Sequence, residues 1–396
     1  MSRIMITGMG VISAIGTTLK ENRDSLINER GGITQLEFYT TAYAGRLPCG
    51  EIKISSAALH KSLFTYPDPT ITRSGLLVLH AAEEAIKDSG LTQEQLASTD
   101  TALVGATTVG GMCLTDELFS DAHEKISGSP YTSSYDCASI TLVAQKRFGI
   151  LGEINTINTA CSSSANAILY GARLIRQGFA RRAIVGGADS LAKFTINGFN
   201  ALNILSYGLC APFDRDRRGL NLGEGAAFLV LEKEEDVNGK KIYAELSGYG
   251  NSNDAFHPSS ISLEGEGPYL SMKEALERAK LNAGDIGYIN AHGTGTENND
   301  ETESVSMQRL FGTPPPFAST KSFTGHTLGA SGAIEAVYSV MGLAHQELYP
   351  SLQFREPIPA TGFIPVKHYR KQAFQHIMSN SFGFGGNCST LIFSKP

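Results

Sequence analysis

Short apolar runs and longer segments with helical spacing of apolar residues alternate along the whole chain. The runs RIMITG at 3–8 and TALVGATT at 101–108 are rich in β-branched residues, contain or adjoin glycine, and predict buried strands. LLVLHAAEEAIKDSG at 76–90 and SANAILYGARLIRQG at 164–178 repeat apolar residues at a helical period. Strands and helices that alternate in this way predict an α/β fold built from layers.

Three segments of the first part of the chain recur in the second part in the same order. The helix at 76–91 and the strand after Asp100 resemble the helix at 269–284 and the strand after Asp285. INTACSSSANAILYGARLI resembles ASTKSFTGHTLGASGAIEAVYSVMGL, and RAIVGGADS resembles HIMSNSFGFGG. This repetition predicts two similarly folded halves, 1–238 and 239–396, joined near Asn238 to Lys241.

Composition and charge exclude several classes of protein. The chain has 396 residues with a net charge of −6 and no block of Lys and Arg, so nucleic acid is an unexpected partner. Its six cysteines are scattered without zinc-site spacing, which indicates a reducing compartment. The apolar start MSRIMITGMGVISAIG lacks a cleavage site, and no apolar run reaches the roughly 18 residues of a membrane span. We therefore expect a cytoplasmic protein without membrane insertion.

Cys161 is the first candidate for chemistry. It lies where an extended apolar run stops at Ala-Cys-Ser-Ser-Ser and an amphipathic helix begins. A helix N-terminus favours a thiolate, so this position predicts a thiol with a lowered pKa and nucleophilic character. The alternative is a buried cysteine that acts only as a small apolar residue.

Two histidines occupy comparable positions in the second half. His292 follows an apolar strand in NAHGTGTENND, and His326 lies at the turn into a helix in STKSFTGHTLGAS. Packing in a loop and helix capping are the structural alternatives. Because corners from two similar halves can converge, we expect both rings to meet Cys161. A metal site is the other interpretation, although its ligands usually have short spacings and a fourth member.

Six motifs together resemble the β-ketoacyl-acyl carrier protein synthases of the elongating type. They are ITGMGVISAIG, TACSSSANAI, APFDRDRRGLNLGEGAAFLVLE, NAHGTGTENNDETE, STKSFTGHTLGASGAIE and NSFGFGG. The resemblance implies a thiolase-like fold, with duplicated halves in a five-layer αβαβα sandwich, and usually a homodimer. It also implies decarboxylative condensation of acyl and malonyl thioesters carried by acyl carrier protein. No metal or other cofactor is implied, because the carrier protein brings the phosphopantetheine arm.

The resemblance also implies catalytic roles. Cys161 matches the nucleophile that takes the acyl group, and His292 and His326 match the rings that stabilise the malonyl enolate. Backbone N–H groups of Cys161 and Phe384 match the oxyanion hole. The resemblance also implies supporting roles for four residues. Lys321 and Glu335 match an ion pair beside the histidines. Asp300 and Glu303 match two acidic positions, and their alternative role is structural pairing behind the site.

Substrate contacts are implied in the same way. Thr294 and Thr296 match hydroxyls that bind the pantetheine arm, and Ser259 is a weaker candidate for that work. Val109 matches a residue of the acyl tunnel, and the Phe384 ring matches a gate on a swinging glycine-rich loop. We also expect Phe199 and Phe382 to bind substrate.

Two departures from the family pattern stand out. Asn387-Cys388 replaces the usual Thr-Asn after the gate loop, which questions how that loop is anchored. At the segments where the family presents a basic rim to acyl carrier protein, this chain reads TYPDPTITRSG, SGSPYTSSYD and ILSYGLCAP, with Arg73 as their one basic residue. Lys61, Lys125 or Arg217 are candidates to replace the rim. The resemblance leaves both fatty-acid synthesis and polyketide or aryl-polyene-like synthesis open. The missing basic rim predicts a carrier protein, and with it a pathway, other than those of housekeeping fatty-acid synthesis.

Three related classes of protein compete with this interpretation. A thiolase needs a second catalytic cysteine, for which Cys388 is the candidate. Initiating synthases carry His and Asn where this chain carries His292 and His326. A non-catalytic chain-length-factor subunit lacks the nucleophile, although this chain could itself form a heterodimer with such a subunit.

Overall fold

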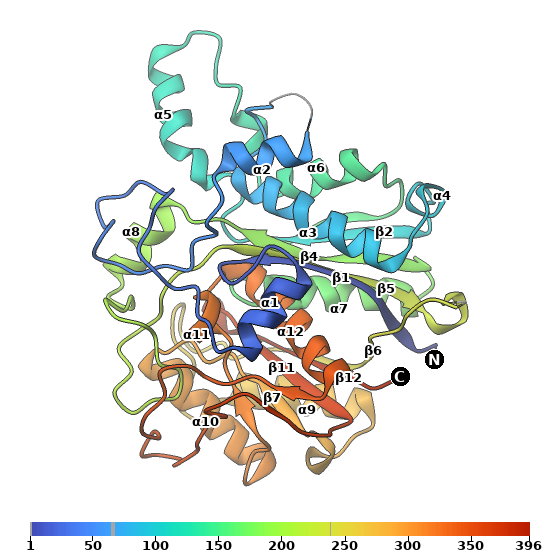
Figure 1. Ribbon diagram of the computed structural model, residues 1–396, viewed down its shortest axis with the longest axis vertical. Helices are drawn as coiled ribbons and strands as arrows, with labels where there is room; N and C mark the ends of the chain where they lie inside the picture. The colour runs from blue at the N-terminus through green and yellow to red at the C-terminus, as the bar shows by residue number, and fades with distance from the viewer. Residues whose placement is uncertain (1, 65–67, 238) are drawn as a thin grey trace.

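The computed structural model describes residues 2–64, 68–237 and 239–396. Figure 1 shows an outer layer of helices, a sheet, a central layer of helices, a second sheet and a second outer layer of helices, stacked from top to bottom. The predicted α/β layers are therefore present, in the thiolase-like arrangement of five layers.

The strands form two matching sets. Among the described residues, the large sheet has the order β3-β2-β4-β5-β1-β6-β12-β11-β7-β8. Their bounds are β1 Ile4–Ser13, β2 Thr101–Ala106, β3 Ile154–Ile157, β4 Arg182–Asp189, β5 Gly225–Lys233, β6 Ala244–Asn253, β7 Tyr288–Asn290, β8 Phe317–Ala318, β11 His376–Phe382 and β12 Asn387–Ser394. A separate short ribbon pairs β9 Glu347–Leu348 with β10 Arg370–Lys371.

The second set repeats the pairing of the first in reverse order. β5 is antiparallel to both β1 and β4, and β2 is parallel to β4 and β3. In the same way β12 is antiparallel to β6 and β11, and β7 is parallel to β11 and β8. The sets join only where Met5 and Ile6 pair with Glu245 and Ala244. The predicted duplication is confirmed, while Asn238 of the proposed boundary lies outside the described residues.

Helices cover both outer faces and fill the space between the sheets. The outer helices α3 and α9 pack on β1 and β6 respectively, and α7 and α12 lie between the sheets (Figure 1). The helix bounds are α1 Leu19–Ile27, α2 Ser56–Leu63, α3 Arg73–Ser89, α4 Gln93–Leu96, α5 Thr115–Glu124, α6 Ser139–Phe148, α7 Ser163–Arg176, α8 Lys193–Ala201, α9 Glu266–Ala279, α10 Glu297–Phe311, α11 Lys321–Thr324 and α12 Ser331–His345. No helix of the described chain is both long enough and apolar enough to span a bilayer.

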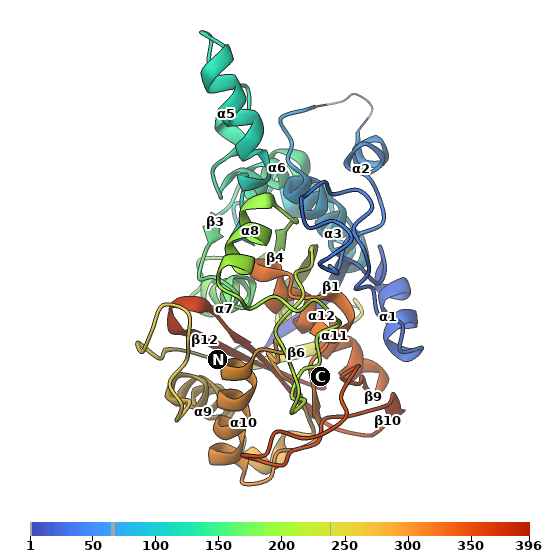
Figure 2. The ribbon, with the colours of Figure 1, turned by 90° about the vertical axis from the view of Figure 1, so that its left-hand side faces the viewer.

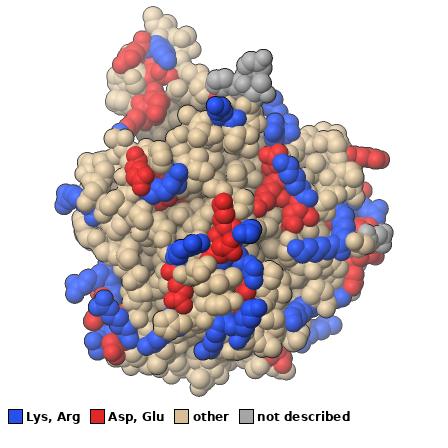
Figure 3. Space-filling model, viewed as in Figure 1, with Lys and Arg blue, Asp and Glu red and all other residues tan. Residues whose placement is uncertain are grey.

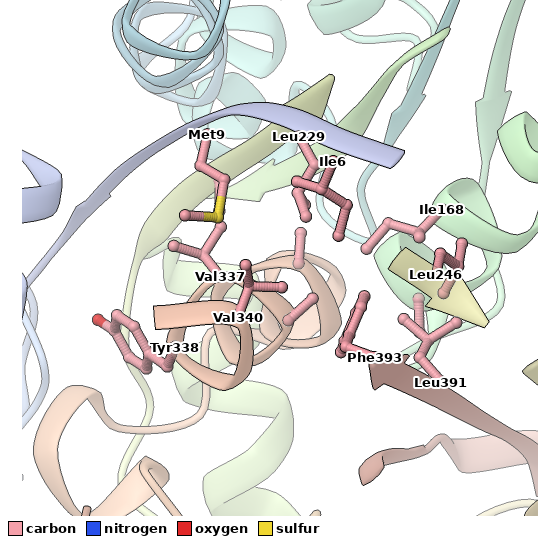
Figure 4. Close-up of a cluster of buried hydrophobic side chains, with 14 of the residues drawn as sticks. Ile6, Met9, Ile168, Leu229, Leu246, Val337, Tyr338, Val340, Leu391 and Phe393 are labelled. Carbon is pink, nitrogen blue, oxygen red and sulfur yellow. The ribbon is translucent and has the colours of Figure 1, made fainter. Parts of the chain in front are cut away.

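The main core surrounds α12. Figure 4 shows Val337 and Val340 of this helix facing β1, β5, β6 and β12, with Ile168 of α7 nearby. Every residue of α12 from Ser331 to Leu343 is buried, since sheets lie on both sides of it. This helix is therefore fixed from all directions.

The two central helices touch at their first turns. A Cβ atom on Gly332 would lie 2.7 Å from the Ala165 nitrogen and 2.8 Å from its Cβ. The Ala333 N–H also donates to Ser164 Oγ across 2.8 Å. Glycine at 332 allows this approach, so the starts of α7 and α12 are held at backbone distance.

One segment projects from the body. Figures 1 and 2 show α5 on an arm that extends away from the layers. Its apolar side chains include Phe119, which is 67% exposed, and Ile126 and Tyr135 are exposed on the same arm. β3, near the base of the arm in Figure 2, is the end strand of the sheet.

Candidate active site

Cys161 lies at the corner where β3 leads into α7, as predicted. Ala160 has a φ of 54°, a left-handed conformation that turns the chain sharply before the helix begins at Ser163. The Cys161 side chain is buried, and the backbone N–H groups of Phe384 and of Cys161 itself lie at its sulfur.

The protonation state of this sulfur differs from the prediction. Burial raises the pKa of the Cys161 thiol to about 11, and the Phe384 N–H and the Lys321 ammonium oppose this only in part. Desolvation of a charged sulfur outweighs the favourable helix terminus here. The prediction of a lowered pKa was wrong, and the Cys161 side chain is held as a neutral thiol.

His292 directly follows β7, at the end of the strand where it was predicted. Its backbone N–H donates to Glu303 Oε1 across 2.8 Å. The Lys321 ammonium lies 3.1 Å from His292 Nδ1 and 2.7 Å from the His292 carbonyl oxygen. Because an ammonium group can only donate, Nδ1 accepts and the ring hydrogen lies on Nε2.

His326 sits between α11 and α12, at the predicted turn. Its backbone pairs with the neighbouring segment through His326 N–H to the Asn221 carbonyl and Gly223 N–H to the His326 carbonyl, at 2.7 and 2.9 Å. The Leu328 N–H donates to His326 Nδ1 across 3.2 Å. This ring therefore also carries its hydrogen on Nε2.

Lys321 and Glu335 form a buried ion pair next to these rings. Both side chains are nearly inaccessible, and Lys321 Nζ donates to Glu335 Oε1. Burial lowers the pKa of both His292 and His326 well below the ordinary value, and the Lys321 charge lowers each further. Both imidazoles are consequently neutral near pH 7.

The three predicted residues converge. The Cys161 sulfur and a ring nitrogen from each histidine all lie within 4.8 Å of one another. The two ring centroids are 5.3 Å apart, and the ring planes are inclined at 83°. A metal ion would need lone pairs at Nε2, yet the bonds to Lys321 and Leu328 place hydrogen there. The arrangement suits hydrogen-bond donation better than metal ligation.

A cavity of about 590 Å³ opens onto these residues. Neutral hydroxyl, amide and aromatic side chains dominate its wall. The lining residues are Cys161, Phe199, Leu202, Asn203, Ile204, Arg218, Gly219, Leu220, Ser259, Ser260, Ile261, His292, Thr294, Thr296, Glu297, Asn298, Asn299, His326, Phe382, Gly383 and Phe384. All the residues predicted to touch substrate line it except Val109, which is buried in a neighbouring core cluster while its N–H donates to Asp189.

The family models agree with this geometry along most of the chain. The "Beta-ketoacyl synthase, N-terminal domain" matches residues 1–237, and the "Beta-ketoacyl synthase, C-terminal domain" matches residues 243–355. The chain belongs to the β-ketoacyl synthase family. Together with the full-length relatives below, this membership makes the chain an acyltransferase of the 3-oxoacyl-[acyl-carrier-protein] synthase type.

Individual relatives span the synthase from end to end. The 3-oxoacyl-[acyl-carrier-protein] synthase 2 of Vibrio cholerae is 32% identical over 423 residues, covering 99% of each chain. A chain of the ishigamide ketosynthase/chain length factor structure superimposes with a TM-score of 0.93 at 29% identity, over 100% of this chain and 99% of that one. A ketosynthase complex with its chain length factor from Xenorhabdus doucetiae gives 0.87 at 32% identity, covering 100% and 98%.

The Phe384 loop of the synthase closes one side of the cavity. The Phe384 ring stacks on Phe199, with centroids 5.8 Å apart and an angle of 12° between the planes. Gly385 and Gly386 both have a φ of 82°, a conformation that favours glycine. The Gly385 N–H donates to the Pro258 carbonyl across 2.7 Å. The Asp254 N–H also donates to the Gly386 carbonyl and Asn253 Nδ2 to the Gly385 carbonyl, at 2.8 and 3.2 Å, so hydrogen bonds to neighbouring segments hold the glycines of this loop.

Asn387 anchors the Phe384 loop through its side chain. Its side-chain oxygen accepts hydrogen bonds from Ser162 Oγ at 2.7 Å, Asn166 Nδ2 at 2.8 Å and Asn251 Nδ2 at 3.1 Å. Two of these donors belong to the start of α7, immediately after Cys161. The loop therefore ends on the same helix turn that presents the nucleophile.

Cys388 of the synthase lies outside the catalytic cavity. It is fully buried beside Ile261 and Phe382, and its sulfur donates weakly to the Gly386 carbonyl. Burial raises its pKa well above the ordinary value. These surroundings do not provide the second catalytic cysteine that a thiolase requires.

Two buried carboxylates hold the histidine loop from behind. Glu303 accepts from the N–H groups of His292 and Gly293, each at 2.8 Å, and burial raises its pKa to about 7. Asp300 accepts from Phe213 N–H at 2.8 Å and from Gly295 N–H. Neither residue lines the cavity, so these contacts favour the structural interpretation.

The predicted docking segments carry little available positive charge. Arg73 is turned inward onto Glu224, with two hydrogen bonds of 2.8 and 2.6 Å. Residues 65–67 of the first segment lie outside the described residues. The segment 204–212 instead exposes Tyr207 and Leu209. Figure 3 shows positive and negative side chains interspersed over one face of the synthase.

The proposed substitutes for a basic rim differ in their accessibility. Arg217 is buried and donates to the carbonyls of Asp214, Thr296 and Glu297. Lys125 pairs with Asp121 on the arm, whereas Lys61 is exposed on α2. Only part of the predicted replacement charge is therefore free to meet a partner.

The sequence reasoning missed several wall residues. Asn298, Asn299 and Ser260 line the cavity, and so does Arg218. Asn298 and Asn299 lie close to the NAHGTGT motif, so their proximity was a usable signal. Arg218 lies within the motif APFDRDRRGLNLGEGAAFLVLE and Ser260 follows Ser259, but their place on the wall depends on how separate loops meet.

Proposed function

We propose that this synthase carries an acyl group on Cys161 and condenses it with a malonyl thioester through His292 and His326. The observation that supports this assignment is the shared protonation of the two rings. Each Nδ1 accepts a fixed hydrogen bond, so both Nε2–H groups are left as donors beside the sulfur. Paired neutral donors suit an oxygen that becomes negative during the reaction.

The first half-reaction is acyl transfer. The sulfur of Cys161 attacks the carbonyl carbon of an acyl thioester, and the pantetheine sulfur leaves with the proton that the thiol gives up. The tetrahedral oxyanion is assigned to the backbone N–H groups of Cys161 and Phe384, which lie at the sulfur in the resting enzyme. Donors already in place need no reorganisation when charge develops.

The second half-reaction breaks one carbon–carbon bond and makes another. The malonyl thioester oxygen accepts hydrogen bonds from His292 and His326 as carbon dioxide leaves, which gives an enolate. The enolate carbon attacks the acyl carbonyl, and Cys161 departs as a thiolate that takes up a proton. The product is a β-ketoacyl thioester two carbons longer than the acyl group.

Lys321 is assigned a positioning role. Its ammonium holds His292 in the donor tautomer, and Glu335 compensates for its charge. Phe384 and Phe199 are assigned to the gate and to acyl contacts, Phe382 to the wall beside His292, and Val109 to a position behind the acyl tunnel. Thr294, Thr296 and Ser259 are assigned to the neutral pantetheine arm, since hydroxyl groups match its amides.

A specialised pathway and an acyl carrier protein other than the general fatty-acid carrier form part of the proposal. Two arguments support it. Arg73 is unavailable to a partner, and similar solved structures include ketosynthases with a chain length factor. The enzyme is expected to work in the cytoplasm, without a metal or a bound cofactor.

A dimer is the expected assembly. β3 ends its sheet, and an end strand can pair with another chain. The arm next to it exposes Phe119 and Ile126, apolar side chains that a partner would cover. The partner is a second copy or a chain-length-factor-like subunit. We keep 1–238 and 239–396 as the proposed halves of each chain.

The decisive experiment looks for an acyl group on Cys161. The enzyme is incubated with acyl carrier proteins from several pathways, each loaded with the same acyl chain, and the peptide that carries Cys161 is analysed by mass spectrometry. We expect a thioester adduct from at least one carrier and none in Cys161→Ala. An adduct on another residue, or none from any carrier, contradicts the proposal.

A further inference from the structure

Arg218 is the one Lys or Arg on the wall of the catalytic cavity, as far as the described residues go. Its side chain is exposed, whereas Cys161 on the same wall is buried. Most of the other lining side chains are neutral, including Thr294, Thr296 and Asn298. One cavity therefore contacts both a buried sulfur and an exposed guanidinium, and its wall is largely neutral.

The neighbours of Arg218 fix its place at the rim. The Gly219 N–H donates to the Gly295 carbonyl across 3.0 Å, and Arg217 donates to the carbonyls of Thr296 and Glu297 at 3.0 and 2.6 Å. The Gly219 backbone and the Arg217 side chain, which flank Arg218 in sequence, are thus both bonded to the segment that carries Thr294 and Thr296. Arg218 thus stands next to the hydroxyl groups assigned to the pantetheine arm.

The Arg218 charge is not used inside the protein. In the part of the chain that the structure describes, no carboxylate lies within ion-pair distance of it, in contrast to Arg215, which pairs with Asp216, and Arg217, which lies 3.8 Å from Glu301. Glu297 is the single carboxylate on the cavity wall and is itself exposed. A guanidinium that is free, exposed and held at a cavity mouth is suited to an anionic ligand.

We propose that Arg218 binds the phosphate group of the phosphopantetheine arm. The inference rests on the proposed function, which brings that arm into this cavity with its sulfur leading. The arm is neutral along its length and ends in a phosphodiester, so its charge pattern suits a largely neutral wall that carries Arg218 at an exposed position. Arginine binds phosphate through two parallel N–H donors. This local contact supplies a positive charge that the turned-in Arg73 does not.

The test compares three thioesters of one acyl chain: acyl carrier protein, free phosphopantetheine and free pantetheine. The rate of Cys161 acylation is measured for wild type, Arg218→Gln and Arg218→Lys. Arg215→Gln is the matched control, because Arg215 lies in the same segment and off the cavity wall. We expect the wild type to be acylated faster by the phosphopantetheine thioester than by the pantetheine thioester. In Arg218→Gln the ratio of these two rates should fall about tenfold.

Each other outcome is also informative. Arg218→Lys should keep part of the preference, and Arg215→Gln all of it. An equal loss with both free thioesters would overturn the inference, as would a loss seen only with carrier protein, which would point to carboxylates of the carrier instead. If wild type acylates Cys161 with none of the three thioesters, the proposed function fails, and that result is distinguishable because it does not involve Arg218.

Discussion

The corner that presents Cys161 and the corner that presents His326 have the same construction in two halves of the molecule. Each connects a strand to a central helix, and each contains a left-handed residue other than glycine, Ala160 with a φ of 54° and Leu328 with a φ of 52°. Their electrostatics differ. The Cys161 corner surrounds the sulfur with backbone N–H groups and a helix start, and Lys321 acts on it only through its charge, whereas the His326 corner lies beside the buried Lys321–Glu335 pair.

The difference indicates how duplication supports catalysis. Two equivalent corners meet because α7 and α12 touch at their first turns. One corner holds a buried thiol, and the other has the Lys321 charge, which fixes His292 as a neutral donor. In the proposed function, attack by the sulfur and stabilisation of the malonyl enolate therefore fall to different halves.

Substitution of Cys161 removes the proposed nucleophile from the first corner. Cys161→Ala is expected to abolish acylation and condensation, since no other sulfur lines the cavity among the described residues. Malonyl decarboxylation should persist in this variant because both Nε2–H donors remain. Measuring both activities separates the two corners, and near-normal condensation would refute the role of Cys161.

Removal of either ring damages the second corner. His292→Ala and His326→Ala are each expected to lower malonyl decarboxylation by about 100- to 1,000-fold, the usual loss for one oxyanion donor. Acylation of Cys161 should fall much less. The measurement is release of labelled carbon dioxide from malonyl carrier protein, with acyl-enzyme followed in parallel. A variant that decarboxylates at the normal rate shows that its ring is misassigned.

Replacement of Lys321 tests whether a charge maintains the second corner. Lys321→Met should reduce decarboxylation by about 10- to 100-fold, because His292 Nδ1 loses its donor. The pKa of both histidines should rise, since the cation that lowers them is gone, although burial still holds them down. Nitrogen NMR of the rings measures tautomer and pKa. Glu335→Gln is the matched control, since it retains an acceptor for Lys321.

The pH dependence of alkylation tests the first corner without mutation. A thiol whose pKa is raised to about 11 is protonated at neutral pH, and its thiolate fraction grows about tenfold per pH unit below that value. Modification of Cys161 by iodoacetamide in resting enzyme should therefore rise steadily from pH 7 to pH 9.5. Cys161→Ala gives the background rate. A plateau below pH 8 would mean that the helix terminus, rather than burial, dominates.

The loop between the corners should give the smallest effect. Asn387→Ala removes the acceptor for Ser162 and Asn166 and should raise malonyl decarboxylation before acylation by a few-fold, while acylation stays close to normal. Phe384→Ala is the reference, since it deletes the gate ring but keeps the backbone N–H, and it should uncouple the steps more strongly. If the rate of malonyl decarboxylation before acylation is the same in wild type and Asn387→Ala, the proposed link between the Phe384 loop and Cys161 is contradicted.

Sequence patterns predicted the frame of this enzyme well. The spacing of apolar residues and the turns made of small residues depend on neighbouring residues in the sequence. The repeated halves and the corners at Cys161, His292 and His326 could therefore be predicted from the sequence. The thiol pKa was not, because it depends on how completely distant loops exclude water. The inward turn of Arg73 depends on Glu224, 151 residues away, and no local signal announces that pairing.

The contact at Gly332 makes the catalytic distance a property of helix packing. The sulfur and the His326 ring are carried by separate halves, and the helices that follow them meet at Gly332 without an intervening side chain. A methyl group added at this position would push the two helix starts apart. The sulfur and the His326 ring would then be misaligned, although every functional group of the synthase is still present.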